Sequence, residues 1–142
     1  PERMSWYVRA SRYGNATIAG APIDAFWLEG DLRISALQQV DFLSRLYRDR
    51  LPFSTWSMDI VKDMMAEKGP DYVFRTKTGL VSRKGQPDLA WWVGWLERGG
   101  DVWHFALNID VEKPEQVAQR KLIVLEVLRM QGLMPGGAAS AN

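Results

Sequence analysis

The chain has 142 residues, enough for one folded domain, and a domain of this size buries about two-thirds of the surface that its unfolded chain exposes. Hydrophobic residues make up 46% and charged residues 25% of the sequence, which excludes disordered, collagen-like and low-complexity chains. The 18 Lys and Arg residues against 17 Asp and Glu leave a net charge of +1. This balance gives no electrostatic footprint for nucleic acid or for an anionic membrane surface.

The sequence contains no cysteine, which excludes disulfides, thiol catalysis and thiolate metal sites but leaves the redox compartment open. The longest apolar run, Leu89–Leu96, is far shorter than the roughly 18 residues of a membrane span, so we expect no membrane insertion. Seven tryptophans are the one compositional excess, and we expect most of them to pack in the core. No linker or internal repeat divides the chain, so residues 1–142 are predicted to form one domain or part of one.

The first third of the sequence predicts a short helix and an unusual loop. Apolar residues at helical spacing indicate a helix over Glu2–Arg12, which ends in a turn at Tyr13, Gly14 and Asn15. The next stretch, Ala16–Ile34, contains glycine and proline but also large apolar side chains, among them Ile23, Phe26, Trp27 and Leu28. This mixture is typical of a compact loop that is packed by its own side chains, and such loops are often functional.

Two further helices are predicted after this loop. Ser35 is a good N-cap for a helix that runs to about Arg50, where apolar residues repeat every three or four positions. Ser57 is predicted to cap the next helix, over Met58–Lys68, which the Gly-Pro pair that follows it brings to an end.

The remainder of the chain changes to strand periodicity. Side chains alternate with a period of two over Asp71–Leu80, and Ala90–Glu97 and Asp101–Ile109 indicate two more strands. The turn at Arg98–Gly100 is tight enough to make the last two strands antiparallel neighbours. A closing helix is predicted from Pro114 to Gly132. The pattern favours an α+β fold, in which helices flank an antiparallel sheet.

Arg120 departs from the expected pattern of the closing helix. Positions 117, 120, 124, 127 and 131 step by three and four, which places Arg120 in line with the inward face of the helix. One interpretation pairs its guanidinium with a structural carboxylate such as Asp110. The other makes it a bidentate clamp for a ligand carboxylate, a geometry that guanidinium suits.

A second group of polar residues ends the first predicted strand. Lys77 and Thr78 place a cation and a hydroxyl late in that strand, and Gly79 lacks a Cβ, so a ligand or another backbone can approach closely. His104 is the only histidine of the chain. With no second histidine and no cysteine, a metal site has too few ligands, and His104 is predicted to be structural.

Seven motifs together resemble the class D, or oxacillinase-type, serine β-lactamases. Their order and spacing agree with that family from the first helix to about Gly132. The motifs are Tyr13-Gly14-Asn15, Phe26-Trp27-Leu28-Glu29-Gly30, Leu51-Pro52-Phe53-Ser54, Lys77-Thr78-Gly79, Trp91-Trp92-Val93-Gly94-Trp95, Phe105-Ala106-Leu107-Asn108-Ile109-Asp110 and Arg120. The resemblance implies a β-lactamase and penicillin-binding transpeptidase fold. It also implies antibiotic resistance through a serine acyl-enzyme that water releases, with a lysine carboxylated by CO2 as general base.

The resemblance assigns roles to the residues around the first strand. Lys77 and Arg120 hold the carboxylate of the β-lactam, and Thr78 adds a hydroxyl hydrogen bond. Gly79 lies against the substrate. Leu80 offers its backbone N–H as one half of the oxyanion hole, where a positioned donor is worth about 3 kcal/mol.

Further roles fall on the loop and the turn before it. The indole N–H of Trp27 donates to the lysine carbamate and keeps it from losing CO2, and Leu28 lines the pocket that admits the deacylating water. Lys77, Leu80 and Trp27 are thus the predicted catalytic residues. Tyr13, Gly14 and Asn15 are similar to a family signature and are expected to shape the loop.

Two departures from the family pattern stand out. The family usually has an aromatic residue where Leu80 follows Lys-Thr-Gly, so the resemblance does not determine the width of the substrate pocket. None of the eight serines has a lysine three residues later or a valine two residues later. The Ser-x-x-Lys motif, which carries the nucleophile and the base, and the Ser-x-Val motif are therefore missing. In this family both precede the tyrosine turn.

We therefore expect residues 1–142 to be the C-terminal part of a class D β-lactamase that acts only together with an upstream segment. That segment carries Ser-x-x-Lys and Ser-x-Val, and the expected partners are this segment, a β-lactam and, as an option, a second copy of the chain. No cofactor beyond CO2 is expected. The family implies a periplasmic or secreted protein. Two alternatives remain: a β-lactam sensor domain that is acylated without turnover, and a penicillin-binding transpeptidase.

Overall fold

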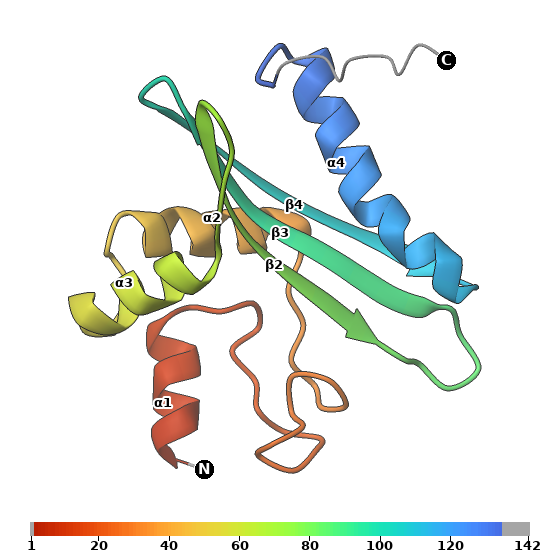
Figure 1. The fold of residues 1–142 in the computed structure, drawn as a ribbon. Coiled ribbons are helices and arrows are strands. Elements are labelled where there is room, and N and C mark those ends of the chain that lie inside the picture. The colour runs from red at the N-terminus through yellow and green to blue at the C-terminus, as the bar shows by residue number, and fades with distance from the viewer. Residues whose placement is uncertain (1, 135–142) are drawn as a thin grey trace.

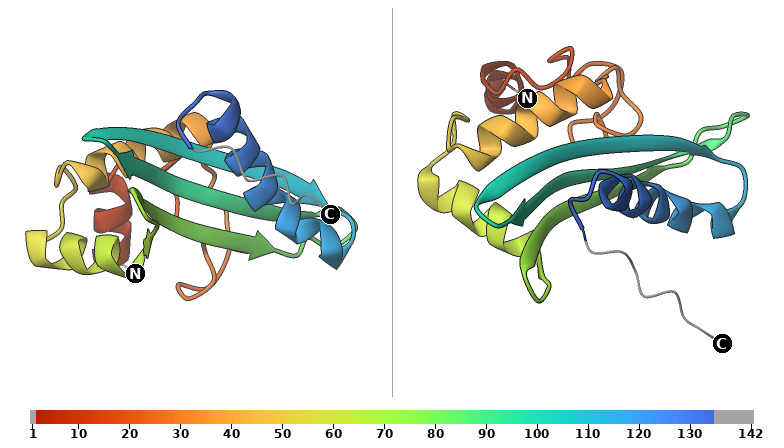
Figure 2. Two further views of the ribbon diagram at one scale, coloured as in Figure 1. Left: turned by 45° about the horizontal axis from the view of Figure 1, so that its top comes forward. Right: turned by 90° about the horizontal axis from the view of Figure 1, so that it is seen from above.

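Helices cover both faces of a single antiparallel sheet in the computed structural model, which describes residues 2–134 (Figures 1 and 2). The strands follow one another across the sheet in chain order, from β1 to β4. Helices α2 and α3 lie on one face and α4 on the other (Figure 2). The predicted α+β architecture, an antiparallel sheet flanked by helices, is confirmed.

The described residues form the following elements, in chain order: α1 (Glu2–Ala10), α2 (Ala36–Tyr47), α3 (Thr55–Met64), β1 (Ala66–Lys68), β2 (Tyr72–Val81), β3 (Asp88–Arg98), β4 (Asp101–Val111), the 3-10 helix η1 (Pro114–Ala118) and α4 (Gln119–Met130). The tight turn between β3 and β4 is confirmed, with Arg98 paired to Asp101. Its two central residues, Gly99 and Gly100, both have positive φ angles, as a type I′ hairpin turn requires.

Capping explains where two helices begin. Ser35 is the N-cap of α2, as predicted: its Oγ accepts the N–H of Gln38 at 3.2 Å, and Gln38 Oε1 accepts the Ser35 N–H at 2.9 Å. The prediction for the next helix is wrong. Ser54, not Ser57, caps α3, because Ser54 Oγ accepts the Ser57 N–H at 3.1 Å and the helix therefore starts one turn earlier.

The sheet has a fourth strand that the sequence does not predict. Residues Ala66–Lys68, expected to end a helix, instead form β1 and pair antiparallel with Val73–Arg75 of β2. The turn between them is closed by the Gly69 N–H, which donates to the Tyr72 carbonyl at 2.9 Å. Pairing with a neighbouring strand overrides the helical preference of this short segment.

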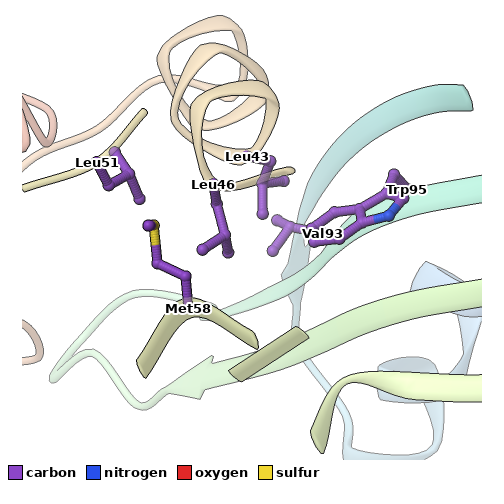
Figure 3. Packing of buried hydrophobic residues seen from close by; sticks show 6 residues of the cluster. All are labelled: Leu43, Leu46, Leu51, Met58, Val93 and Trp95. Atoms are coloured by element: carbon purple, nitrogen blue, oxygen red, sulfur yellow. The ribbon is translucent and has the colours of Figure 1, made fainter. Parts of the chain in front are cut away.

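The two faces of the sheet bury separate hydrophobic clusters. Alternate residues of β3 point to opposite faces, so Val93 and Trp95 pack against α2 and α3, and Trp92 and Leu96 pack against α4. Figure 3 shows the first cluster, which consists of Leu43, Leu46, Leu51, Met58, Val93 and Trp95. The second consists of Phe74, Trp92, Leu96, Val124, Leu128 and Met134. The sheet is therefore held rigidly from both sides.

The inward face of α4 differs in detail from the prediction. Val124 and Leu128 are buried, but Val127 is 50% exposed. The stretch 114–118 is a 3-10 helix, with about three residues per turn, and α4 starts only at Gln119. The change of pitch rotates the buried stripe onto positions 120, 124 and 128, so Arg120 keeps its inward place. None of the helices among residues 2–134 is long and apolar enough to span a membrane.

His104 lies on β4 against aromatic rings. Its ring centroid is 5.7 Å from that of Tyr47 and 5.9 Å from that of Trp95. Its Nε2 atom is buried and has no hydrogen-bond partner among the described residues. Burial, helped by the positive charge of Arg48, lowers the pKa of His104 below its ordinary value. This packing supports the structural role that the sequence indicates.

The lowered pKa predicts how stability responds to acid. The folded chain favours neutral His104, whereas the unfolded chain binds a proton as the pH falls below about 6.5, so the free energy of unfolding decreases from there down to the folded-state pKa. Urea unfolding at about pH 7.5 and about pH 5.5, one setting on either side of that value, should show this decrease in the wild type and a smaller one in His104→Phe. Parallel curves for the two proteins would contradict this assignment.

Candidate active site

One side of β2 is only partly covered. Strand β1 pairs with residues 73–75, and the Thr76 N–H still donates to the Met65 carbonyl at 2.9 Å. From residue 77 to residue 81, no strand of the described chain pairs with this side of β2. We call this stretch the open edge. Because backbone groups point alternately to the two sides of a strand, the N–H groups of Thr78 and Leu80 point outward at the open edge, as that of Thr76 does.

Lys77 lies over the open edge. Its Nζ donates to the Thr78 carbonyl at 2.6 Å, and the side chain is exposed. Among the ion pairs of the described residues, none includes Lys77. An ammonium group without a carboxylate partner, beside outward N–H groups, is suited to bind an anionic ligand.

Arg120 reaches the same segment from the opposite face of the sheet. It lies half-buried in the first turn of α4, and its Nη1 donates to the Gly79 carbonyl at 3.1 Å. The interpretation that paired it with Asp110 is wrong, because Asp110 pairs with Arg83 of the β2–β3 turn. The structure thus gathers Lys77, Thr78, Gly79 and Arg120 at the open edge, with the Leu80 N–H at its far end.

The Tyr13-Gly14-Asn15 turn closes the base of the loop that follows it. The Asn15 N–H donates to the Arg33 carbonyl at 2.9 Å, and Asn15 Oδ1 accepts the Arg33 N–H at 3.0 Å. Asn15 Nδ2 donates to the Asp31 carbonyl at 2.7 Å. One side chain therefore ties both ends of the loop together, which supports the predicted role of Asn15 in shaping it.

Tyr13 packs against α2. Its ring packs edge-on against Phe42 with centroids 4.8 Å apart. Burial raises the pKa of the Tyr13 hydroxyl, and a hydrogen bond with the Gln39 side chain partly offsets this. Tyr13 is therefore an anchor for the turn in this structure.

The loop lies on the β2 side of the sheet, below β2 in Figure 1 and in the left view of Figure 2. Phe26 is its buried anchor, and the ring of Trp27 stands edge-on to it with centroids 5.2 Å apart. No hydrogen bond of the described residues joins the loop to β2, and about half of the surface of Trp27 and Leu28 is open to solvent.

Several positioning residues were not singled out from the sequence. Arg33 Nη1 donates to the Gly30 carbonyl at 2.6 Å, inside the loop. Arg45 Nη1 donates to the Ser11 carbonyl at 2.6 Å and holds the end of α1 against α2. For Arg45 the sequence offers one signal, since Asp41 lies one helical turn before it and the two side chains form an ion pair. For Arg33 it offers none. No cluster of metal-binding side chains occurs among residues 2–134.

Comparison with known proteins gives consistent matches. A family model described as the penicillin binding protein transpeptidase domain matches residues 1–129. Beta-lactamase OXA-5 of Pseudomonas aeruginosa is 44% identical over 138 residues, 95% of this chain and 51% of that protein. Beta-lactamase OXA-48 of Klebsiella pneumoniae is 42% identical over 134 residues, 94% of this chain and 50% of that protein.

Solved structures agree. The class D β-lactamase YbXI from Nostoc superposes with a TM-score of 0.88 at 42% identity, covering 94% of this chain and 56% of that one. The class D β-lactamase FUS-1 (OXA-85) from Fusobacterium nucleatum subsp. polymorphum gives a TM-score of 0.87 at 36% identity, covering 94% and 55%. The chain thus spans about half the length of the curated relatives that it matches.

The turn at Gly14 provides a test of how the loop is held. Gly14 has a φ of +55°, and a Cβ there would lie 2.0 Å from the Arg33 carbonyl oxygen. Gly14→Ala should lower the free energy of unfolding by more than about 2 kcal/mol, since it adds left-handed strain and displaces the carbonyl that accepts the Asn15 N–H.

Gly85→Ala is the matched control, because Gly85 has a φ of +72° but a Cβ there would meet no atom of the described residues within 4 Å. It should cost only about 1 kcal/mol, from backbone strain alone. Urea unfolding of both variants gives the comparison, and equal losses would show that the contact with Arg33 does not hold the turn.

Proposed function

Since this chain belongs to the penicillin binding protein transpeptidase domain family and its homologues are class D β-lactamases, we propose that it takes part in the hydrolysis of β-lactam antibiotics through a serine acyl-enzyme. The observation that carries the proposal is the open edge of β2. There, two cations from opposite faces of the sheet, Lys77 and Arg120, lie beside outward backbone N–H groups. A β-lactam offers the matching features, a carboxylate and a carbonyl that becomes an oxyanion.

The substrate lies along the open edge in this proposal. Lys77 and Arg120 bind its carboxylate, and the Thr78 hydroxyl adds a hydrogen bond. The missing Cβ of Gly79 lets the ring approach the strand, since the only side-chain atom of the described residues within 4 Å of a Cβ there belongs to Trp91, at 3.5 Å. The Leu80 N–H donates to the lactam oxygen as negative charge develops on it, which lowers the barrier to acylation.

The nucleophile and the base come from outside these 142 residues. The chain has no Ser-x-x-Lys and no Ser-x-Val motif, and it spans about half the length of its curated relatives. We assign both motifs to an upstream segment, whose lysine, carboxylated by CO2, supplies general-base chemistry. The half-exposed Trp27 fits a neighbour of that lysine, because its indole N–H donates to none of the described residues.

The proposal includes three further assignments. Leu28, exposed beside Trp27, lines the path of the deacylating water. The protein is periplasmic or secreted, the compartments in which an enzyme of this class meets its substrate. A homodimer is compatible with the proposal but is not required by it, since every named group at the open edge comes from one chain.

Complementation tests the proposed activity. This chain alone should not turn over a chromogenic cephalosporin, because it lacks the nucleophile. Co-expression with a segment that carries Ser-x-x-Lys and Ser-x-Val should give continuous hydrolysis. One equivalent of product followed by a stop would instead indicate a β-lactam sensor. Turnover by this chain alone would contradict the proposal.

The role of the Leu80 backbone is tested separately. Leu80→Pro removes the N–H, and proline is tolerated where that group faces away from the neighbouring strand. In the complemented enzyme it should lower kcat about 100-fold or more, the usual cost of losing one oxyanion donor. Leu80→Ala keeps the N–H and should change kcat by less than about threefold. Similar losses in both variants would show that the side chain, not the N–H, matters.

A further inference from the structure

Arg75 occupies the point where the covered part of β2 meets the open edge. It pairs with Ala66, the first residue of β1, and it is followed by Thr76, whose N–H donates to the Met65 carbonyl at 2.9 Å. The next residue is Lys77. Arg75 and Lys77 are two positions apart, so their side chains share one face of β2.

The Arg75 side chain binds two other elements at once. Its Nε donates to Glu97 Oε1 on β3 at 2.8 Å, and its Nη1 donates to the Lys62 carbonyl at 2.5 Å and lies 3.2 Å from Asp63 Oδ1. Only 20% of the side chain is exposed. We call Arg75 and these three partners the Arg75 brace. A half-buried, forked set of charge-assisted bonds is far more restrictive than a surface ion pair.

Both ends of the brace are fixed. Glu97 Oε1 also accepts the indole N–H of Trp95 at 2.8 Å, and Trp95 is completely buried in the core. The Lys62 carbonyl belongs to the last turn of α3, whose carbonyls have no partner within the helix, and a cation there is also favoured by the helix dipole. The brace therefore joins the core, through β3, to the end of α3.

We propose that Arg75 is a positioning residue for Lys77: the brace fixes the end of α3 against β2, and so sets where the open edge begins and how Lys77 and Thr78 are presented on it. This inference rests on the proposed function, in which Lys77 binds the substrate carboxylate. Arg75 itself touches no substrate. The Arg75 guanidinium also pairs with both Glu97 and Asp63. Of the two cations on this face of β2, Arg75 and Lys77, only Lys77 therefore has no carboxylate partner in the described chain.

The sheet offers a matched control at its other end. Arg98 also forms an ion pair, with Asp71 at 2.7 Å, and also donates to a backbone carbonyl, that of Leu133, at 3.1 Å. Its side chain is 30% exposed. Arg98 is paired with Tyr72, at the opposite end of β2 from Lys77. If Arg75 has only a structural role, Arg75→Met and Arg98→Met should change KM and amide hydrogen exchange to a similar extent.

The first measurement is kinetic and uses the complemented enzyme. Arg75→Met should raise KM for an anionic cephalosporin by about tenfold or more, with a smaller change in kcat, because carboxylate binding is disturbed first. Arg75→Lys keeps the positive charge but cannot make all the hydrogen bonds of the guanidinium group, so its KM should lie between those of Arg75→Met and the wild type. Arg98→Met should leave KM within about twofold of the wild type, even if it lowers the thermal unfolding midpoint as much as Arg75→Met does. Equal KM values for Arg75→Met and Arg98→Met would overturn the proposal.

The second measurement does not depend on activity. Amide hydrogen exchange in the complemented protein should be about tenfold faster or more over residues 76–79 in Arg75→Met, and unchanged there in Arg98→Met. If this exchange result holds but the wild type hydrolyses no β-lactam, the proposed function fails and the effect of Arg75 on the open edge stands. If exchange over residues 76–79 is the same in both variants, the positioning role is wrong.

Discussion

The site depends on one constraint: the described residues cover the outer side of β2 only as far as Thr76. Strand β1 is three residues long, so its pairing with β2 ends at Arg75. Beyond that point the backbone groups of β2 need other partners, since unpaired strand edges are both reactive and costly. Lys77 meets this need in part by donating to the Thr78 carbonyl, and Arg120 holds the same stretch of β2 by donating to the Gly79 carbonyl. Among the described residues, the outward N–H groups of Thr78 and Leu80 have no partner.

The two hydrophobic clusters make the open edge rigid. Trp95 anchors the sheet to α2 and α3 on one face, and Trp92 anchors it to α4 on the other. A binding site on a strand held from both sides keeps its geometry better than one on a loop. Four of the seven tryptophans, Trp91, Trp92, Trp95 and Trp103, lie in the sheet and pack in or against the two clusters. Trp6, Trp27 and Trp56 are more than half exposed, and Trp27 belongs to the loop that Asn15 closes.

Local signals explain which parts of the fold could be predicted from the sequence. The alternation in β2, the Gly99–Gly100 hairpin and the Ser35 N-cap each depend on residues within a few positions of one another, and all are observed. Strand β1 could not be predicted, because it exists only through pairing with a strand that follows it. The serine that caps α3 was misplaced by one turn, since Ser54 and Ser57 are equally good caps by residue type.

The candidate site, like the fold, could be predicted from the sequence only where the signals are local. The motif residues at positions 77–80 could be found from their order along the chain, and the inward place of Arg120 from helical spacing. The partners of Arg120 and Arg75 could not, because Gly79 is 41 residues from Arg120 and Glu97 is 22 residues from Arg75. Contacts at such separations are set by the packing of the sheet and helices, which no local pattern encodes.

In the proposed enzyme this chain supplies the carboxylate-binding and oxyanion groups, and the acylated serine lies on another segment. Intact-mass spectrometry of the complemented protein, quenched in acid shortly after addition of a β-lactam, tests this division of roles directly. We predict that the mass of the upstream segment increases by that of the β-lactam and that the mass of this chain does not change. A covalent adduct on this chain would contradict it.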